Sequence, residues 1–357
     1  MKTRPTLESV AEQASVSRQT VSNVLNSPHL VRPETIERVR AVIDEVGYRP
    51  HGAARQLRTH QSRVLGLRVQ HSVDGFDAAV MDRFLHGLTE QAQALGYRIM
   101  LFAATDDRGE IGQYSELLDT LEIDAFVLTH THHDDERTRW LAEHDVPFVT
   151  FGRPWDRPDS SVPVHDHAWV DVDGSVGARA AVEHLRALGH GRIAFIGWPD
   201  GSDVGDDRRH GWREAMRGGS VPESDLDSLT VGVLDGIANG AEAAERLLEQ
   251  ASPTAFVCAS DYLALGTLAA TRSGAALRSP STYAVVGFDD TPVARAVGLS
   301  SVAQPLSEAA RQALSLLLDQ LSRTRRPGSV WDDHHVLLNP SLVVRASSTA
   351  PVPATSQ

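Results

Sequence analysis

The chain has 357 residues, of which 41% are hydrophobic, and this is enough to form the packed cores of roughly two or three domains. It contains no apolar run long enough to cross a bilayer, and a polar helical pattern follows Lys2 and Arg4 in place of an export signal. The single cysteine, Cys258, excludes an internal disulfide and is typical of a reducing compartment. We therefore expect a cytoplasmic protein that does not associate with membranes.

The net charge of −13 is unevenly distributed along the chain. Residues 1–63 carry ten Lys and Arg against six Asp and Glu, whereas the remaining residues carry 24 against 41. A basic amino-terminal part joined to an acidic body is typical of a DNA-binding domain linked to a domain that binds a small molecule.

The stretch TLESVAEQASVSRQTVSNVLN, residues 6–26, predicts two short helices joined by a tight turn. Thr6 and Ser17 can cap them, because a hydroxyl at such a position accepts an otherwise unpaired backbone N–H. Apolar residues recur at helical spacing in both halves. The spacing fits a helix-turn-helix, whose second helix lies in the major groove of DNA. A helical hairpin with a solvated polar face is the alternative interpretation of this stretch alone.

The outer side of the second helix carries side chains that can read bases. Arginine contacts guanine, and glutamine or asparagine contacts adenine, through pairs of hydrogen bonds. The DNA-contacting residues predicted in this stretch are Thr6, Ser17, Arg18, Gln19, Thr20, Ser22 and Asn23.

A third helix is predicted from Pro33, which suits a first helical position, to a stop at Gly47. Three motifs then stand in order: T-L-x-x-V-A at 6–11, V-S-x-x-T-V-S-x-V-L-N at 16–26, and G-Y-R-P-x-x-A-A-R-x-L at 47–57. Together they resemble the DNA-binding domain and hinge of the lactose-repressor (LacI/GalR) family of bacterial transcription regulators.

This resemblance implies a hinge that folds on the operator and pairs with the hinge of a second subunit. It places Ala54 in the DNA contact and inserts Leu57 into the minor groove, where an apolar wedge unstacks a base step. From the residues alone, a polar linker with Leu57 packed on the body is the alternative. His51, Ser15 and Asn23 stand where the family commonly has Asn, Gly and Arg, so the resemblance does not define the operator sequence.

From Val64 onward, short apolar strands alternate with amphipathic helices, which indicates an α/β fold with parallel sheets and helices on both faces. A segment rich in Pro, Asp and Ser, residues 156–166, is expected to divide the strands into two lobes. The predicted strands are Val64–Val69, Tyr97–Ala103, Ala125–Thr129, Pro147–Phe151, Arg192–Gly197, Thr230–Leu234, Ala255–Ala259 and Tyr283–Phe288, and the predicted helices include Val80–Leu95, Gly174–Leu188, Asp207–Arg217 and Asp261–Thr271.

The resemblance covers this region to about residue 346 and implies a two-lobed, periplasmic-binding-protein-like receptor. We expect an all-α helix-turn-helix domain over residues 1–49 and a hinge helix or linker over 50–62. A ligand-binding and dimerisation domain over 63–346 and a disordered tail over 347–357 are expected to follow.

Ligands of such folds bind beyond the carboxyl ends of the strands, here in a cleft between the lobes. Matching to the family places two ligand-binding residues: Arg208, three residues before Gly211-Trp212, and Asp289, after a buried strand. Ser260 occupies a ligand-facing position of the family, while Asp261 is expected to cap a helix. Arginine and aspartate facing each other suit vicinal hydroxyls, which both bind through charge-assisted hydrogen bonds.

Tryptophans in loops after strands are candidates to stack on a sugar ring, whereas Trp169 is equally compatible with a core position. Asp173, in a match to the family's V-D-x-D-G segment, is expected at the rim of the cleft. Asp290 and Arg209 are equally suited to surface ion pairs. The predicted ligand-binding residues are Arg208, Asp289, Ser260, Trp155, Trp198 and Asp173.

Other chemistry finds little support in the sequence. Phosphate-binding loops, nucleophile elbows and dinucleotide fingerprints are absent from it. The histidines at 130, 132 and 133, and the run His165-Asp166-His167, have no accompanying cysteine. We therefore expect no catalytic residue, metal or cofactor, and the chain does not resemble an enzyme.

The favoured hypothesis is a sequence-specific transcription regulator, a repressor that a sugar or oligosaccharide inducer releases from a palindromic operator. A homodimer is expected, because a two-fold DNA site needs two reading heads. Alternatives are the same kind of regulator with a nucleobase corepressor, a cytosolic sugar-binding protein, and a sugar-modifying enzyme.

Overall fold

The computed structural model describes residues 5–48, 61–69, 78–120, 123–155, 166–219, 221–272, 283–323 and 334–349. The chain divides into two compact units, Met1–Ser62 and Arg63–Gln357. Ala54, Leu57 and the expected hinge helix lie outside the described residues, so the division between a reader at 1–49 and a hinge at 50–62 stays a prediction.

Over its described residues 5–48, the first unit is a bundle of three α-helices with one 3-10 turn. Thr6 accepts a hydrogen bond from the Ser9 amide at 3.2 Å, and Ser17 accepts one from the Thr20 amide at 3.0 Å, so both predicted caps are confirmed. The helices are α1 (Leu7–Gln13), α2 (Arg18–Asn26) and α3 (Pro33–Val46), with η1 (Pro28–Leu30) before α3, and they enclose a core of Val10, Ala11, Ala14, Val21, Val24, Val39 and Tyr48.

Two backbone positions of this unit have left-handed conformations. Gly47 has φ +64° and ends α3, as the sequence predicts. Ser15, in the turn between α1 and α2, has φ +53°, a conformation that glycine adopts more readily. The turn of the helix-turn-helix therefore forms with a serine, at a modest conformational cost.

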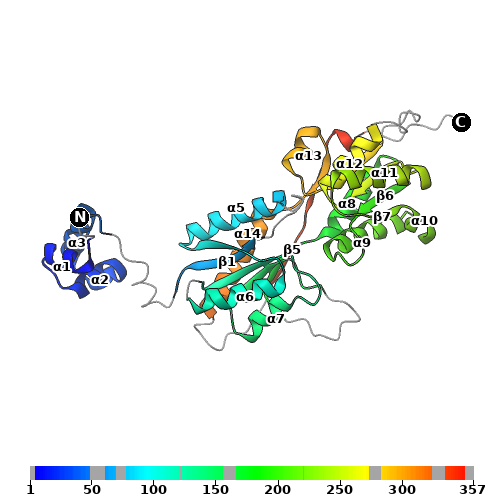
Figure 1. Cartoon of the computed structure of the whole chain (residues 1–357). Coiled ribbons are helices and arrows are strands. Elements are labelled where there is room, and N and C mark those ends of the chain that lie inside the picture. Colours follow the sequence, from blue (N-terminus) through cyan, green and yellow to red (C-terminus); the bar gives the residue numbers. More distant parts are fainter. Residues whose placement is uncertain are drawn as a thin grey trace. The chain divides into compact units, whose positions relative to one another are not determined.

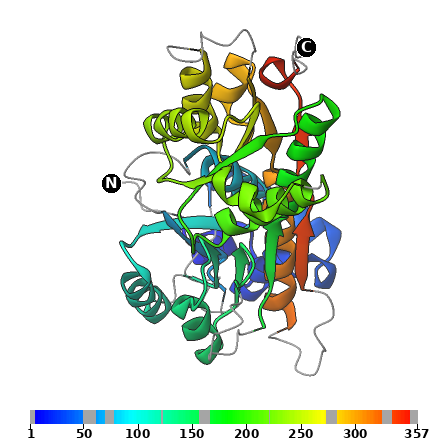
Figure 2. The same cartoon turned by 90° about the vertical axis from the view of Figure 1, so that its right-hand side faces the viewer.

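The second unit contains two six-stranded sheets, one in each of two lobes (Figures 1 and 2). Neighbouring strands run parallel, except that β12 runs antiparallel to β10. The first sheet, in order, is β11 (His335–Leu338), β5 (Trp169–Val172), β4 (Phe148–Phe151), β3 (Ala125–Thr129), β1 (Val64–Val69) and β2 (Arg98–Ala103). The second is β12 (Ser341–Val343), β10 (Ser300–Ala303), β9 (Ala284–Phe288), β8 (Ala255–Cys258), β6 (Ile193–Gly197) and β7 (Thr230–Gly232).

Helices cover both faces of each sheet, as the α/β pattern predicts. On the first sheet, α5 (Ala78–Ala94) and α14 (Leu306–Arg323) share one apolar core, and α6 (Asp107–Asp119) and α7 (Glu136–Glu143) another. On the second, α8 packs along α9 and α11 along α12, with the short α10 and α13 beside them. These helices are α8 (Gly174–Ala187), α9 (Val204–Arg217), α10 (Glu223–Ser228), α11 (Ile237–Gln250), α12 (Asp261–Arg272) and α13 (Pro292–Val297).

The chain crosses between the lobes at β5 to α8, β10 to α14, and β11 to β12. In Figure 1 the orange α14 accordingly lies among the blue and teal elements of the first lobe. The predicted lobe boundary at residues 156–166 is therefore wrong, because β5 follows that segment and still belongs to the first sheet. The expected tail also begins too early: Ser347 and Ser348 are buried in η3 (Ala346–Ser348), where Ser347 accepts the Ser300 amide at 2.8 Å.

The eight predicted strands are present; two have the predicted bounds, and the ends of the other six shift by one or two residues. Four short strands, β5, β10, β11 and β12, were not among the predicted strands. Of the helices in the described segments, none combines the length and the apolar character that a bilayer span requires.

Candidate functional site

The outward face of α2 presents the polar side chains that the sequence assigns to DNA. Arg18 and Gln19 are exposed, whereas Ser22 and Asn23 are half-buried. Gln19 Nε2 donates a hydrogen bond to Asn23 Oδ1 at 3.0 Å, so these two side chains form a connected polar surface one helical turn apart. Ser17 and Thr20 are joined at 2.9 Å beside the helix start.

In the second lobe, Arg208 on α9 is buried at the carboxyl ends of the strands. Its Nη1 donates to the Ala259 carbonyl, and its Nη2 lies 3.7 Å from Asp289 Oδ1. The guanidinium carbon lies 3.8 Å from the ring centre of Phe288 and 5.2 Å from that of Trp198. Arg208 Nε is buried and has no hydrogen-bond partner among the residues that the structure describes. The predicted residues Arg208, Asp289 and Trp198 are thus brought together.

Asp289 ends β9 in a strained conformation, with φ +105°. Gln304, which follows β10, donates a hydrogen bond to Asp289 Oδ1 at 2.7 Å. Arg83, on α5 of the first lobe, donates to the Asp289 carbonyl at 3.3 Å. The aspartate is therefore held by its own lobe and contacted by the other.

Ser260 has the helix-capping role that the sequence predicts for Asp261. Ser260 Oγ accepts the Leu263 amide at 3.1 Å, so Ser260 rather than Asp261 caps α12. Ser260 also donates to Asp235, which follows β7. Asp261 is instead buried and accepts hydrogen bonds from the Thr291 amide at 2.7 Å and the Ser301 hydroxyl at 2.6 Å. Burial, together with the charge of Asp289, raises the pKa of Asp261 to about 7.

Arg153, directly after β4, links the first lobe to the second. Its Nε donates to Asp171 Oδ2 at 2.7 Å, and its Nη2 donates to Asp207 Oδ2 at 2.9 Å on α9. The guanidinium lies 4.7 Å from the ring centre of Trp155. Burial raises the pKa of Asp207. Trp155 is thus connected through Arg153 to Asp207, which precedes Arg208 in the sequence.

The indole nitrogens of Trp155 and Trp198 are buried and have no hydrogen-bond partner in the described segments. Asp173, at the end of β5, caps α8 by accepting the Val176 amide at 2.9 Å. Sequence reasoning missed Gln304, Arg153, Asp207 and Asp235. Three of these, Gln304, Arg153 and Asp235, stand within a few residues of a strand end, which is the signal that identifies them.

The first lobe carries a hollow of about 530 Å³ at the ends of β1 and β3. Arg137, which lies 3.5 Å from the lining residue Asp107, is buried with Glu110 and Asp135, at 2.9 Å and 2.7 Å. His132, at the edge of the hollow, pairs with Asp107 at 2.9 Å. The hydrogen bond from Asp107 raises the pKa of His132 to about 9. The residues that line the hollow are Arg68, Thr105, Asp106, Asp107, Arg108, His130, His132 and Glu136.

A helix-turn-helix bundle and a two-lobed receptor with an arginine and an aspartate at its strand ends define a class of protein: a DNA-binding regulator that responds to a small molecule. Comparison with known proteins bears this out. Residues 6–51 match the family described as bacterial regulatory proteins, lacI family, and residues 182–348 match a periplasmic binding protein-like domain.

Relatives match over nearly the whole chain. It is 32% identical over 355 residues to the HTH-type transcriptional regulator CelR of Thermobifida fusca, covering 96% of this chain and 98% of the relative. It is 27% identical over 350 residues to the HTH-type transcriptional repressor PurR of Haemophilus influenzae (strain PittEE), covering 96% and 98%. The solved transcriptional regulator CelR–cellobiose complex is 30% identical with a TM-score of 0.67, covering 96% of this chain and all of that one.

The chain belongs to the LacI family of bacterial regulatory proteins, and the predicted resemblance is confirmed. It is a DNA-binding transcription regulator and not an enzyme.

Proposed function

We propose that this regulator is a homodimeric repressor that a sugar, binding between the two lobes, releases from a palindromic operator. The observation that carries the proposal is a set of buried donors without a hydrogen-bond partner among the described residues: Arg208 Nε and Trp198 Nε1 beside Asp289, and Trp155 Nε1 next to Arg153. Buried donors are nearly always hydrogen-bonded in native proteins, because leaving one unpaired costs about 1–3 kcal/mol. A polar ligand in the cleft supplies the missing acceptors.

The chemistry of this donor set favours a sugar. Hydroxyl groups accept from indole and guanidinium N–H groups, and they donate to the carboxylate of Asp289. Indole rings also suit the apolar face of a pyranose. The solved CelR complex contains cellobiose, which makes this disaccharide the first candidate to test. A nucleobase corepressor is the second candidate, since PurR repressors are among the relatives.

The ligand exerts its effect through contacts that join the lobes. Arg153–Asp207, Arg83–Asp289 and His133–Asp203 (3.4 Å) each pair a residue of the first lobe with one of the second. A ligand that binds one arrangement of the lobes more tightly shifts the population toward it. A ligand that favours the lobe arrangement with weaker DNA binding then lowers the affinity for the operator.

A dimer is proposed because a two-fold operator requires two heads. Apolar side chains exposed in the second unit offer surface for it. Leu101 is exposed on the edge strand β2, and Val293 and Val297 are exposed one turn apart on α13. Unpaired strand edges and exposed apolar residues are typical of interfaces.

On the DNA, Arg18, Gln19, Ser22 and Asn23 are proposed to contact bases, and Leu57 is proposed to enter the minor groove. Leu57→Ala is then expected to weaken operator binding while leaving sugar binding unchanged.

The experiment is a thermal-shift and calorimetric screen of the full chain with cellobiose, other mono- and disaccharides, and nucleobases. A true effector raises the melting temperature with concentration, because it binds the native state and not the unfolded one. If a nucleobase stabilises the protein and no sugar does, the effector is a nucleobase corepressor and not a sugar. Sugar turnover would contradict the proposal outright.

A further inference from the structure

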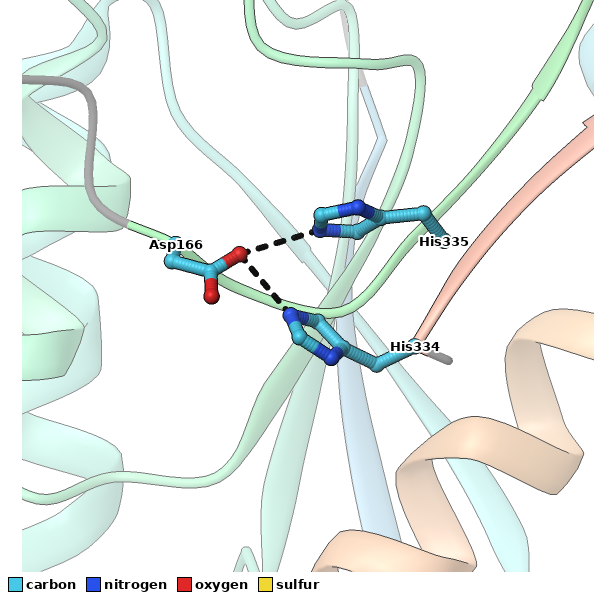
Figure 3. Close-up of side chains that lie close together, drawn as sticks. All are labelled: Asp166, His334 and His335. Atoms are coloured by element: carbon cyan, nitrogen blue, oxygen red, sulfur yellow. Dashed lines mark hydrogen bonds and ion pairs between the residues drawn. The ribbon is translucent and has the colours of Figure 1, made fainter. Parts of the chain in front are cut away.

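Asp166, His334 and His335 come together at the outer corner of the first sheet (Figure 3). His335 begins β11, and Asp166 lies three residues before Trp169, the first residue of β5. The two strands are parallel with His335 opposite Trp169, so their amino-terminal ends lie side by side. Asp166 and His334 are 168 positions apart in the sequence, and the sheet alone makes them neighbours.

The three side chains converge on a single point. Asp166 Oδ1 lies 2.8 Å from His334 Nε2 and 3.1 Å from His335 Nε2, and Figure 3 shows both rings turned toward that oxygen. The ligand atoms of a tetrahedral zinc site, with bonds of about 2.0–2.1 Å, stand roughly 3.3 Å apart. If the three ligand atoms move apart by a few tenths of an ångström, a zinc ion therefore fits between them.

The rings are held in place before any ion arrives. Trp169 stacks on His335 with ring centres 4.8 Å apart and an angle of 16°. The Trp169 amide donates to the His334 carbonyl at 3.1 Å, which fixes the backbone between the strands. The His334 side chain is only 13% exposed, whereas those of His335 and Asp166 are 42% and 72% exposed. One side of the cluster is therefore rigid, and the other is open to water and to an entering ion.

We propose that this corner binds a divalent transition metal of the zinc class through one carboxylate oxygen of Asp166 and Nε2 of His334 and His335, with water completing the shell. Two imidazoles and a carboxylate select zinc, nickel, copper or iron over magnesium and calcium, which prefer oxygen ligands. The proposal departs from the sequence expectation of no metal, which weighed only histidines adjacent in the chain.

A second group, Asp107, His132 and Asp135, is less suited to a cation. Asp135 is paired with Arg137 at 2.7 Å, and Asp107 lies 3.9 Å from Arg68 and 3.5 Å from Arg137. These guanidinium groups already neutralise the carboxylates and repel a metal ion. In the proposed site, by contrast, the groups that contact Asp166 in the described part of the chain are the two imidazoles.

Metal binding is expected to stabilise the first lobe and to leave ligand binding in the cleft unchanged. The site lies at the amino-terminal ends of β5 and β11, whereas the proposed sugar site lies at the carboxyl ends of the strands. Metal and sugar should therefore stabilise the native state independently, with additive thermal shifts.

The test uses the full, untagged chain, stripped with a chelator and titrated with Zn²⁺ by competition calorimetry and with Co²⁺ by visible absorption. We expect one equivalent to bind and to raise the melting temperature. His335→Ala and Asp166→Asn, both on the exposed side, should each weaken binding by at least tenfold, the lower bound for loss of an outer-shell partner. His132→Ala and His86→Ala are the controls, because each removes a histidine that pairs with an exposed or half-exposed aspartate elsewhere.

Absence of saturable Zn²⁺ binding to the wild type would overturn the proposal, as would wild-type affinity for Zn²⁺ in both site variants or a loss of affinity confined to His132→Ala. Asp166→Asn should keep its response to any sugar that stabilises the wild type. Failure of the metal site is thus distinguishable from failure of the sugar site.

Discussion

Two buried arginines, Arg137 in the first lobe and Arg208 in the second, have opposite surroundings. Each nitrogen of the Arg137 guanidinium donates a hydrogen bond to the carboxylates of Glu110 and Asp135 or to the carbonyls of Thr129 and His130. Arg208 donates to one carbonyl and lies 3.7 Å from Asp289, and its Nε has no partner in the described part of the chain. An arginine whose donors are all paired stabilises the fold, whereas an arginine with an unpaired donor can bind a ligand.

The largest effect is expected from Arg137→Met. The substitution leaves Glu110 and Asp135 buried with fewer partners, and breaking a buried pair in this way costs about 3–5 kcal/mol. Urea unfolding followed by circular dichroism measures the loss. Arg139→Met, on the same helix, is the control, since the Arg139 side chain is exposed and its surface pair contributes less than about 1 kcal/mol. Comparable stabilities of the two variants would contradict the distinction between the arginines.

Arg208→Ala is expected to weaken sugar binding by about 10- to 100-fold, the equivalent of one charged hydrogen-bond group at 1.5–3 kcal/mol. Operator binding should persist, because the DNA-contacting residues belong to the other unit. Arg209→Ala provides a matched control: Arg209 is the next residue of α9, and it pairs with Asp200 and Asp206. Calorimetry with the stabilising sugar should show unchanged affinity for Arg209→Ala. An equal loss of sugar affinity in both variants would show that Arg208 does not contact the sugar.

Asp261 provides a pH-dependent test of the second lobe. Its pKa is about 7 in the folded protein against 3.8 for the unperturbed group, so the folded state binds the proton more tightly. This carboxyl therefore makes the protein less stable as the pH rises from about 4 to 7, by on the order of 3 kcal/mol. Unfolding at pH 5 and 7.5 should show Asp261→Asn gaining stability relative to wild type at the higher pH. The same difference at both pH values would contradict the assignment, and exposed Asp119→Asn controls for general charge effects.

Much of the fold could be predicted because the information is local. Caps at Thr6 and Ser17, the stop at Gly47, and the longer strands follow from side-chain chemistry and periodicity within a few residues. Strands β5, β10, β11 and β12 have three or four residues each and were missed, although β4, β7 and β8 are equally short and were predicted. Without β10, its neighbour Gln304 could not be recognised as a partner of Asp289.

The candidate site was predictable where a motif carried it and not where distant segments meet. Arg208 and Asp289 lie in motifs that match the family, whereas Arg153–Asp207 joins two lobes. The lobe boundary failed because composition marks a loop and does not reveal which sheet the next strand enters. The choice between Ser260 and Asp261 as cap depends on hydrogen bonds from Thr291, which follows β9, and from Ser301 in β10, and no local pattern contains these.

The smallest effect concerns the hollow in the first lobe. His132 has a pKa of about 9 beside Asp107, against 6.5 when unperturbed. Its protonated form contributes stability below about pH 6.5, and this contribution disappears as the pH rises through 9. Because the side chain is half-exposed, His132→Gln should cost less than about 1 kcal/mol at pH 6 and nothing at pH 10. A constant cost at both pH values would show a packing role instead.

The measurement that tests the account most directly is operator binding by fluorescence anisotropy, with and without the stabilising sugar, at physiological salt. A palindromic duplex selected from random DNA should bind the wild type far more tightly than random sequence does. Sugar should weaken that binding by about 5- to 150-fold, the usual range of coupling between two sites. Arg208→Ala should bind the same duplex and should need about 10- to 100-fold more sugar for the same response. A protein that prefers no palindrome, or whose operator affinity ignores a sugar that it binds, would contradict the account.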